Sequence, residues 1–307
     1  MTTLTIPSPP HPGAPMRPVP WRQLAWVAWR QYRAALAGAI VFFAVPSAYL
    51  LAMGLRIHTA YDASQHCGNG QTSACQAAGL QLDLQYHATA DITAAVLTLL
   101  PVFIGAFAGA PILARELDSG TARFAWTQGA GRTRWTIARL ALPALCLTVM
   151  AAAFSQLFQW FYQPFFSNGT DAPLEPQFFA LTGVALAAWT LAAFAIGALA
   201  GVVIRNAVPA IIASLICSGG LLALTSFVLR RHYLAPLVDR VDGGQGVGAW
   251  VISQTTLFPS AGPAKVVTIF QPASRYWPFQ LIEGGWLLAL AVLLFAVTLW
   301  LVRRRAA

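Results

Sequence analysis

The chain has 307 residues, of which 57% are hydrophobic and only 9% carry a charged side chain. A soluble domain carries about 25% charged residues, so this composition excludes a soluble protein and predicts an all-α integral membrane protein. The formal net charge of +9 does not indicate nucleic-acid binding, because no basic run is interleaved with aromatic residues in a soluble domain. Arginines that meet anionic headgroups at the ends of membrane spans explain this charge.

The N-terminal region precedes the first apolar segment. Residues 1–20 are rich in proline and have no apolar signal-peptide core, so we expect a disordered cytoplasmic tail. Residues 21–34 mix tryptophans with arginines, and on a helix Trp21, Leu24 and Tyr32 share one face. This pattern favours a helix lying in the headgroup plane. The alternative is that the segment extends the first span into the cytoplasm.

Six apolar segments are long enough to cross a bilayer, which takes about 20 residues in a helix. No aspartate, glutamate, lysine, arginine or histidine lies between their ends. They form one membrane domain over 35–302, followed by a basic cytoplasmic tail at 303–307. The predicted spans are 35–55, 92–114, 140–162, 179–204, 207–229 and 284–302.

The basic residues predict the orientation of these spans. With both termini inside the cell, 13 basic residues lie in cytoplasmic segments and 6 in outer segments. This distribution obeys the positive-inside rule. We therefore expect a multi-pass protein of the plasma membrane with both termini in the cytoplasm, where lipids surround the spans.

The first outer loop contains Cys67 and Cys75. A disulfide can form between them if the loop faces an oxidising compartment. An alternative is a metal site, although the spacing matches no familiar zinc pattern. The histidines that would join the thiols in that alternative are His58, His66 or His87.

The longest outer segment is 230–283, in which short apolar and aromatic runs alternate with proline and glycine. Runs of this length do not cross a membrane. We therefore expect re-entrant or interfacial helices before the last span.

Several kinds of chemistry lack the residues that they need. The chain has no GxxxxGK[ST] phosphate loop, and its only lysine, Lys265, stands in a different context. It also has no HExxH zinc motif. We therefore expect no catalytic residues, no bound cofactor and no resident metal ion, and predict that the chain is not itself an enzyme.

Small residues spaced four apart occur in two of the predicted spans. Gly105 with Gly109, and Gly197 with Gly201, predict close contacts between helices. The sequence leaves open whether these contacts lie within one bundle or between two copies of the chain.

The segment between the second and third predicted spans, 115–139, holds five arginines and two acidic residues. Anchoring at the headgroups explains arginines and Trp135, but it does not explain acidic residues followed by a Gly-Thr turn. The side chain of Asp118 or Ser119 is placed to cap a short helix. We therefore predict an ordered helix on the cytoplasmic side.

With these features the chain resembles ABC-2 type exporter permeases, especially those common in actinobacteria. The resemblance rests on the six spans, the interfacial helix and a Glu-x-x-x-Gly-Thr pattern at Glu116, Gly120 and Thr121. The further matching segments are 125–128, 132–135 and 271–283.

The resemblance implies that the chain works with a separate ATPase subunit, in a complex with two permease subunits that form a homodimer or a heterodimer. The helix between the second and third spans would then be a coupling helix that docks on the ATPase. The residues that would lie at or near this contact are Glu116, Asp118, Gly120, Thr121, Arg123, Arg132 and Arg134. A non-transporting sensor or scaffold that binds a cytoplasmic partner through the same loop is the alternative.

Overall fold

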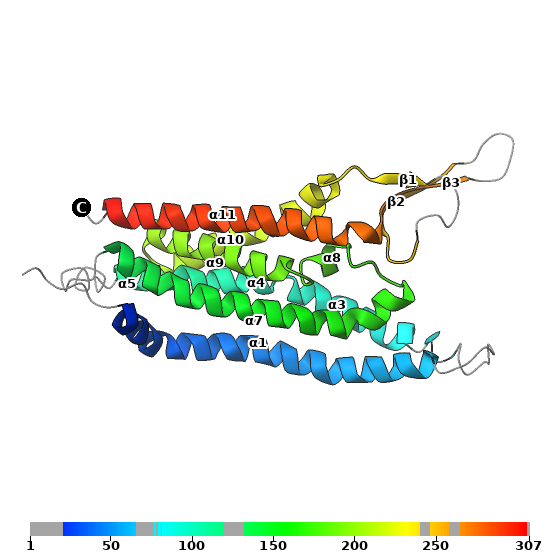
Figure 1. Cartoon of the computed structure of the whole chain (residues 1–307), viewed down its shortest axis with the longest axis horizontal. Coiled ribbons are helices and arrows are strands. Elements are labelled where there is room, and N and C mark those ends of the chain that lie inside the picture. Colours follow the sequence, from blue (N-terminus) through cyan, green and yellow to red (C-terminus); the bar gives the residue numbers. More distant parts are fainter. Residues whose placement is uncertain are drawn as a thin grey trace, which may run out of the picture.

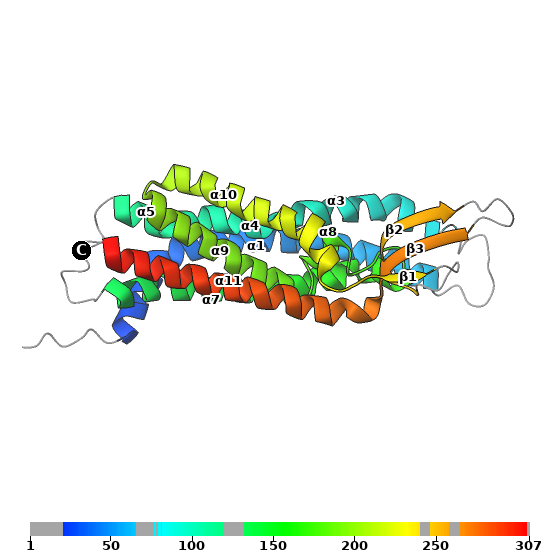
Figure 2. The same ribbon diagram turned by 90° about the horizontal axis from the view of Figure 1, so that it is seen from above.

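The computed structural model is an elongated bundle of helices with a small sheet at one end (Figures 1 and 2). Among the residues that the structure describes, six helical stretches are long and apolar enough to cross a membrane, which confirms the predicted helical membrane protein with six spans. These stretches are Ala37–Gln65, Asp83–Asp118, Thr133–Asn168, Ala185–Ile204, Ala207–His232 and Ala273–Arg304. The structure describes residues 21–65, 77, 79–80, 82–118, 132–239, 246–257 and 265–305, with the backbone alone at 21–36, 132, 265 and 305.

Four of the six predicted spans lie wholly within one of these stretches and are shorter than it. The first predicted span, 35–55, begins before Ala37 but lies within the longer helix α1 (Trp21–Gln65). The predicted fourth span, 179–204, begins too early. Residue 179 ends the short helix α8 (Pro176–Phe179), and the chain then turns through Gly183, whose φ of 61° is left-handed, before α9 (Ala185–Ile204) begins. The turn breaks the helix because few residues other than glycine adopt this backbone conformation.

The helices follow the chain order in an up-and-down arrangement, with several spans built from more than one element. The first and third spans are α1 (Trp21–Gln65) and α7 (Arg132–Asn168), which pack along each other. The second span consists of η1 (Asp83–His87), α3 (Ala88–Leu97), α4 (Leu100–Ile104), η2 (Gly105–Gly109) and α5 (Ala110–Asp118). The last two spans are α10 (Ala207–Leu224), extended by η3 (Thr225–Leu229) and η4 (Arg230–His232), and α11 (Tyr276–Arg305), preceded by η5 (Ala273–Arg275).

Helix α9 is the centre of the bundle, since it contacts α4, α5, α7, α10 and α11. The predicted glycine contacts are confirmed here as contacts within one chain. A Cβ atom built on Gly109 would lie 2.6 Å from the carbonyl oxygen of Phe194, and one on Gly197 would overlap the carbonyl oxygen of Gly105. The backbones of the second and fourth spans therefore touch, as small residues at a helix interface allow.

The segment 230–283 differs from the sequence-based expectation, because it contains a three-stranded antiparallel sheet in the order β1-β3-β2. The strands are β1 (Leu237–Asp239), β2 (Trp250–Leu257) and β3 (Lys265–Gln271). The prediction of re-entrant or interfacial helices before the last span is therefore wrong for these residues. β2 and β3 are rich in valine, isoleucine and threonine, which favour strands, and β3 pairs with a neighbour on each edge.

The two ends of the bundle differ. At one end, called here the terminal end, α1 begins, α5 ends, α7 begins and α11 ends (Figure 1). At the opposite sheet end, α1 ends, α3 begins and the three strands project from the helices (Figures 1 and 2). Residues 21–34 form the start of α1, whose first turns bend away from the bundle axis (Figure 2). Their placement in the headgroup plane stays a prediction.

Candidate functional site

The second span ends at Asp118 and the third begins at Arg132, both at the terminal end of the bundle (Figure 1). Close to these two ends, Glu116 on α5 forms an ion pair with Arg139 on α7. Both side chains are largely buried, with 19% and 14% exposed. The Arg139 guanidinium also lies 5.1 Å from the ring centroid of Trp135, a cation–π distance. The two helices that carry the connection are thus joined at its base.

The last helix is attached to the same place. Arg303 Nε on α11 donates a hydrogen bond to Thr133 Oγ1 at the start of α7, at 2.8 Å. Arg304 lies 4.6 Å from the ring of Trp300 on its own helix. Arginines therefore connect three spans at the terminal end. A displacement of α7 there would act on both α5 and α11 through these contacts.

The structure brings together some of the residues predicted for coupling. Glu116, Asp118 and Arg134 all lie at the terminal end, where Asp118 is exposed and Glu116 is turned toward Arg139. Arg132 begins α7, and only its backbone is described. The predicted contact residues Gly120, Thr121 and Arg123, like the expected coupling helix itself, lie outside the described residues.

A second polar group, at the sheet end, was missed by the sequence analysis. Arg230 and Glu283 are both fully buried, and two hydrogen bonds join them: Arg230 Nη2 to Glu283 Oε1 at 2.7 Å and Arg230 Nε to Glu283 Oε2 at 3.0 Å. The same carboxylate accepts from Trp189 Nε1 at 2.8 Å and from the Tyr233 hydroxyl at 3.2 Å. Each charged residue stands one position beyond a predicted span, so nothing in the sequence indicated that it would be buried.

The arginine of this pair is held on its other sides as well. Arg230 Nη1 donates to the carbonyl oxygen of Pro176 at 3.0 Å, and the guanidinium lies 4.5 Å from the ring centroid of Phe179. The pair therefore joins η4, α8, α9 and α11. A buried ion pair with this many hydrogen bonds fixes an arrangement of helices rather than offering a reactive group.

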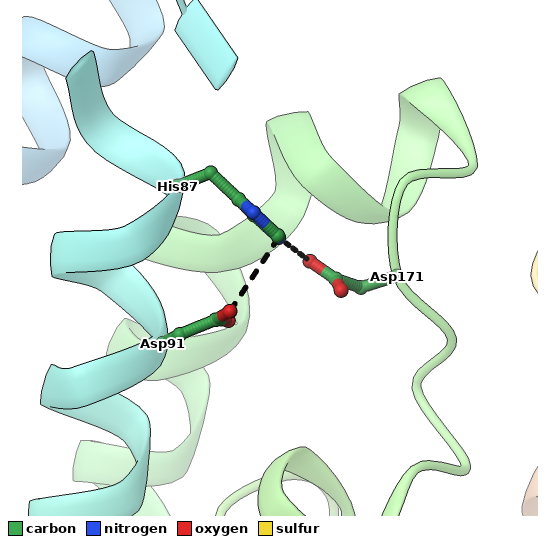
Figure 3. A group of neighbouring side chains, drawn as sticks. All are labelled: His87, Asp91 and Asp171. Atoms are coloured by element: carbon green, nitrogen blue, oxygen red, sulfur yellow. Dashed lines mark hydrogen bonds and ion pairs between the residues drawn. The ribbon is translucent and has the colours of Figure 1, made fainter. Parts of the chain in front are cut away.

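One group among the described residues has the composition of a metal site. His87, Asp91 and Asp171 meet at the sheet end, each offering one ligand atom, and these atoms lie within 4.8 Å of one another (Figure 3). Two histidines of the alternative metal site predicted for the outer loop thus have neighbours elsewhere. His87 belongs to the group just described, and the ring of His58 stacks on that of Trp160, with centroids 4.6 Å apart. Cys67, Cys75 and His66, and with them the predicted disulfide, lie outside the described residues.

Comparison with known families supplies the class of the protein. A family model described as "ABC-2 membrane transporter related" matches residues 40–230, which is well over half of the 307-residue chain. The chain belongs to this family. No curated protein and no solved structure matches it at a significant level.

In this ABC-2 membrane protein, the matched residues cover nearly all of the first five candidate spans. It includes the ion pair of Glu116 with Arg139 and the connection at 119–131. It ends at Arg230, so the sheet and α11 lie beyond it. The family assignment supports a multi-pass membrane component, and it does not depend on the sheet, which lies outside the matched residues.

Proposed function

We propose that the chain is the membrane-spanning permease subunit of an ATP-driven exporter, which moves its substrate across the plasma membrane with energy from a separate ATPase subunit. The family match over residues 40–230 carries this proposal. The sequence supports the need for a partner, because it contains no phosphate loop with which to bind ATP. Two permease subunits, identical or different, would form the complete transporter with two ATPase subunits.

The terminal end of the bundle is the cytoplasmic side in this proposal. The described part of α5, α7, the α9–α10 turn and α11 places many arginines there, whereas fewer basic residues lie at the sheet end. The arginines of the terminal end include Arg115, Arg134, Arg139, Arg205, Arg303 and Arg304. An excess of this kind is typical of the cytoplasmic face of a membrane protein.

The connection 119–131 would dock on the ATPase, with Asp118, Gly120, Thr121, Arg123, Arg132 and Arg134 at or near the contact. Glu116 has a different task in this scheme. Its carboxylate pairs with Arg139 inside the bundle, so it holds α5 against α7 and positions the connection. Because α5 also contacts α9, a movement of the connection would reach the central helix. ATP would favour one of two bundle conformations through the affinity of the closed ATPase for it.

The docking claim is tested at Arg123. We expect Arg123→Glu to reduce co-purification of the partner ATPase and ATP-dependent export at least tenfold, because one charge of the contact is reversed. Arg304→Glu is the matched control, since Arg304 is an exposed arginine at the same end of the bundle, and it should behave like the wild type. Normal binding and export by Arg123→Glu would overturn the docking claim, and normal binding without any ATP-dependent export would favour a scaffold.

The positioning role of Glu116 is tested by a charge exchange. Glu116→Arg and Arg139→Glu alone should each lower export severalfold, because each leaves two like charges facing one another. The double variant Glu116→Arg with Arg139→Glu restores the pair in the opposite sense and should recover most of the activity. If the double variant is no better than Glu116→Arg alone, then Glu116 acts on the ATPase directly and its proposed positioning role is wrong.

A further inference from the structure

The group His87, Asp91 and Asp171 is assembled from two distant parts of the chain. His87 ends η1 and Asp91 follows one turn later, so that both side chains project from the same face of one helix (Figure 3). Asp171 lies in the segment after α7 and reaches across to them. His87 Nε2 is 2.8 Å from Asp171 Oδ2 and 3.8 Å from Asp91 Oδ2.

The two carboxylates are short of positive charge. The Tyr162 hydroxyl approaches both of them, at 2.5 Å from Asp91 Oδ1 and 3.0 Å from Asp171 Oδ2, but it has a single proton to donate. Among the described residues, neither aspartate pairs with an arginine or lysine. Two carboxylates thus share one imidazole and one hydroxyl, although Asp171 is 9% exposed and Tyr162 fully buried.

The negative charge of these two aspartates also affects the pKa of a third carboxyl group, that of Glu175. Burial raises the pKa of Glu175 to about 7, and the charges of Asp171 and Asp91 contribute to that rise. An electronegative, partly buried group that retains an exposed edge is favourable for a cation. His87 and Asp91 provide that edge, with 27% and 34% of their side chains exposed.

We propose that His87 Nε2 and the carboxylates of Asp91 and Asp171 bind a divalent transition metal, with zinc as the type case. One imidazole and two carboxylates are ligands that zinc accepts, and three protein ligands leave a fourth position for water. Ligand atoms about 2.0–2.1 Å from a tetrahedral zinc lie roughly 3.3 Å from each other. The two separations from His87 Nε2, 2.8 and 3.8 Å, bracket this value, and all three ligand atoms lie within 4.8 Å of one another.

Tyr162 would be a positioning residue of this site. Its hydroxyl lies within hydrogen-bond distance of both carboxylates and can donate its proton to either. Its ring is fixed by Phe165 and Phe178, whose centroids lie 5.1 and 4.3 Å away. Hydrogen bonds of this kind orient metal ligands and raise metal affinity. The bound ion would join the start of the second span to the segment after the third, at the sheet end of the bundle.

The test uses the full chain purified in detergent, stripped with a chelator and titrated with zinc ions. A Cys67→Ser/Cys75→Ser background removes binding by the outer-loop thiols. We expect one zinc ion per chain and a rise in melting temperature on binding. Asp171→Asn, which keeps the side-chain shape, should weaken binding at least tenfold, and Tyr162→Phe should weaken it by about tenfold, the lower end of measured effects for residues that orient metal ligands.

His232→Ala is the matched control, because His232 is an exposed histidine at the same end that belongs to no such group among the described residues. The zinc affinity of this variant should be unchanged. Cobalt ions provide a readout that does not depend on a variant. Their visible spectrum in the Cys67→Ser/Cys75→Ser chain should indicate nitrogen and oxygen ligands in tetrahedral geometry. The proposal is overturned if the Cys67→Ser/Cys75→Ser chain binds no metal, or if Asp171→Asn and His232→Ala bind zinc equally well.

Discussion

Replacement of Glu283 by alanine is expected to lower the free energy of unfolding by about 3–5 kcal/mol, which is the usual cost of breaking a buried ion pair. The reason is the partner that is left behind. Arg230 is completely buried, and its charge would lose both of its bonds to the carboxylate. The hydroxyl of Tyr233 and the indole N–H of Trp189 would lose an acceptor at the same time.

The melting temperature in detergent, followed by the loss of monodisperse protein on size exclusion, measures this effect. Arg231→Met is the matched control, since Arg231 is the exposed neighbour of the buried arginine, and it should change the melting temperature little. The double variant Arg230→Met with Glu283→Met should be more stable than Glu283→Ala, because it leaves no buried charge without a partner. A melting temperature of Glu283→Ala equal to that of the wild type would contradict the burial of this pair.

The second large effect is expected at Gly197. A Cβ atom there would overlap the carbonyl oxygen of Gly105 and lie 2.8 Å from the backbone nitrogen of Ala110. Both obstacles are backbone atoms, which cannot rotate away as a side chain can. Gly197→Ala should therefore lower the free energy of unfolding by about 1–3 kcal/mol, the range for overpacked sites, and Gly197→Val should lower it further.

Gly220→Ala provides the control for this series, because a Cβ atom at Gly220 meets nothing within 4 Å. Gly220 lies inside α10, where alanine is a better helix former than glycine by roughly 0.5–1 kcal/mol. The two Gly→Ala variants should thus shift the melting temperature in opposite directions. Equal shifts would mean that the second and fourth spans are not in backbone contact.

This contact also bears on the proposed transport cycle. The second span ends at the connection proposed to dock on the ATPase, and its last part, α5, lies directly against the central helix α9. A Cβ atom on Gly201 of α9 would overlap the carbonyl oxygen of Ala110 on α5. Such a close backbone contact leaves no room for the two helices to approach each other further. A displacement of α5 toward α9 would therefore move α9 as well, and a displacement away from it would break the contact.

The spans and their small-residue contacts are readable from the chain because they depend on local patterns. An apolar run of about 20 residues indicates a membrane-spanning helix whatever the rest of the sequence contains, and all six spans were predicted. Glycines four apart must lie on one face of a helix, so the two glycine pairs predicted close contacts between helices, and the structure then showed that the second and fourth spans make them. The sheet was missed because short apolar runs do not by themselves distinguish a strand from a helix. The valine, isoleucine and threonine of β3 were the signal available.

The two polar groups depend on which helices become neighbours, and that is decided only when the bundle forms. Arg230 and Glu283 stand 53 residues apart, each at the end of a predicted span, and nothing in the sequence pairs them. His87 and Asp171 are separated by 84 positions. Desolvation makes each charge depend on a partner that no local pattern specifies, so the packing of the helices alone determined these pairs.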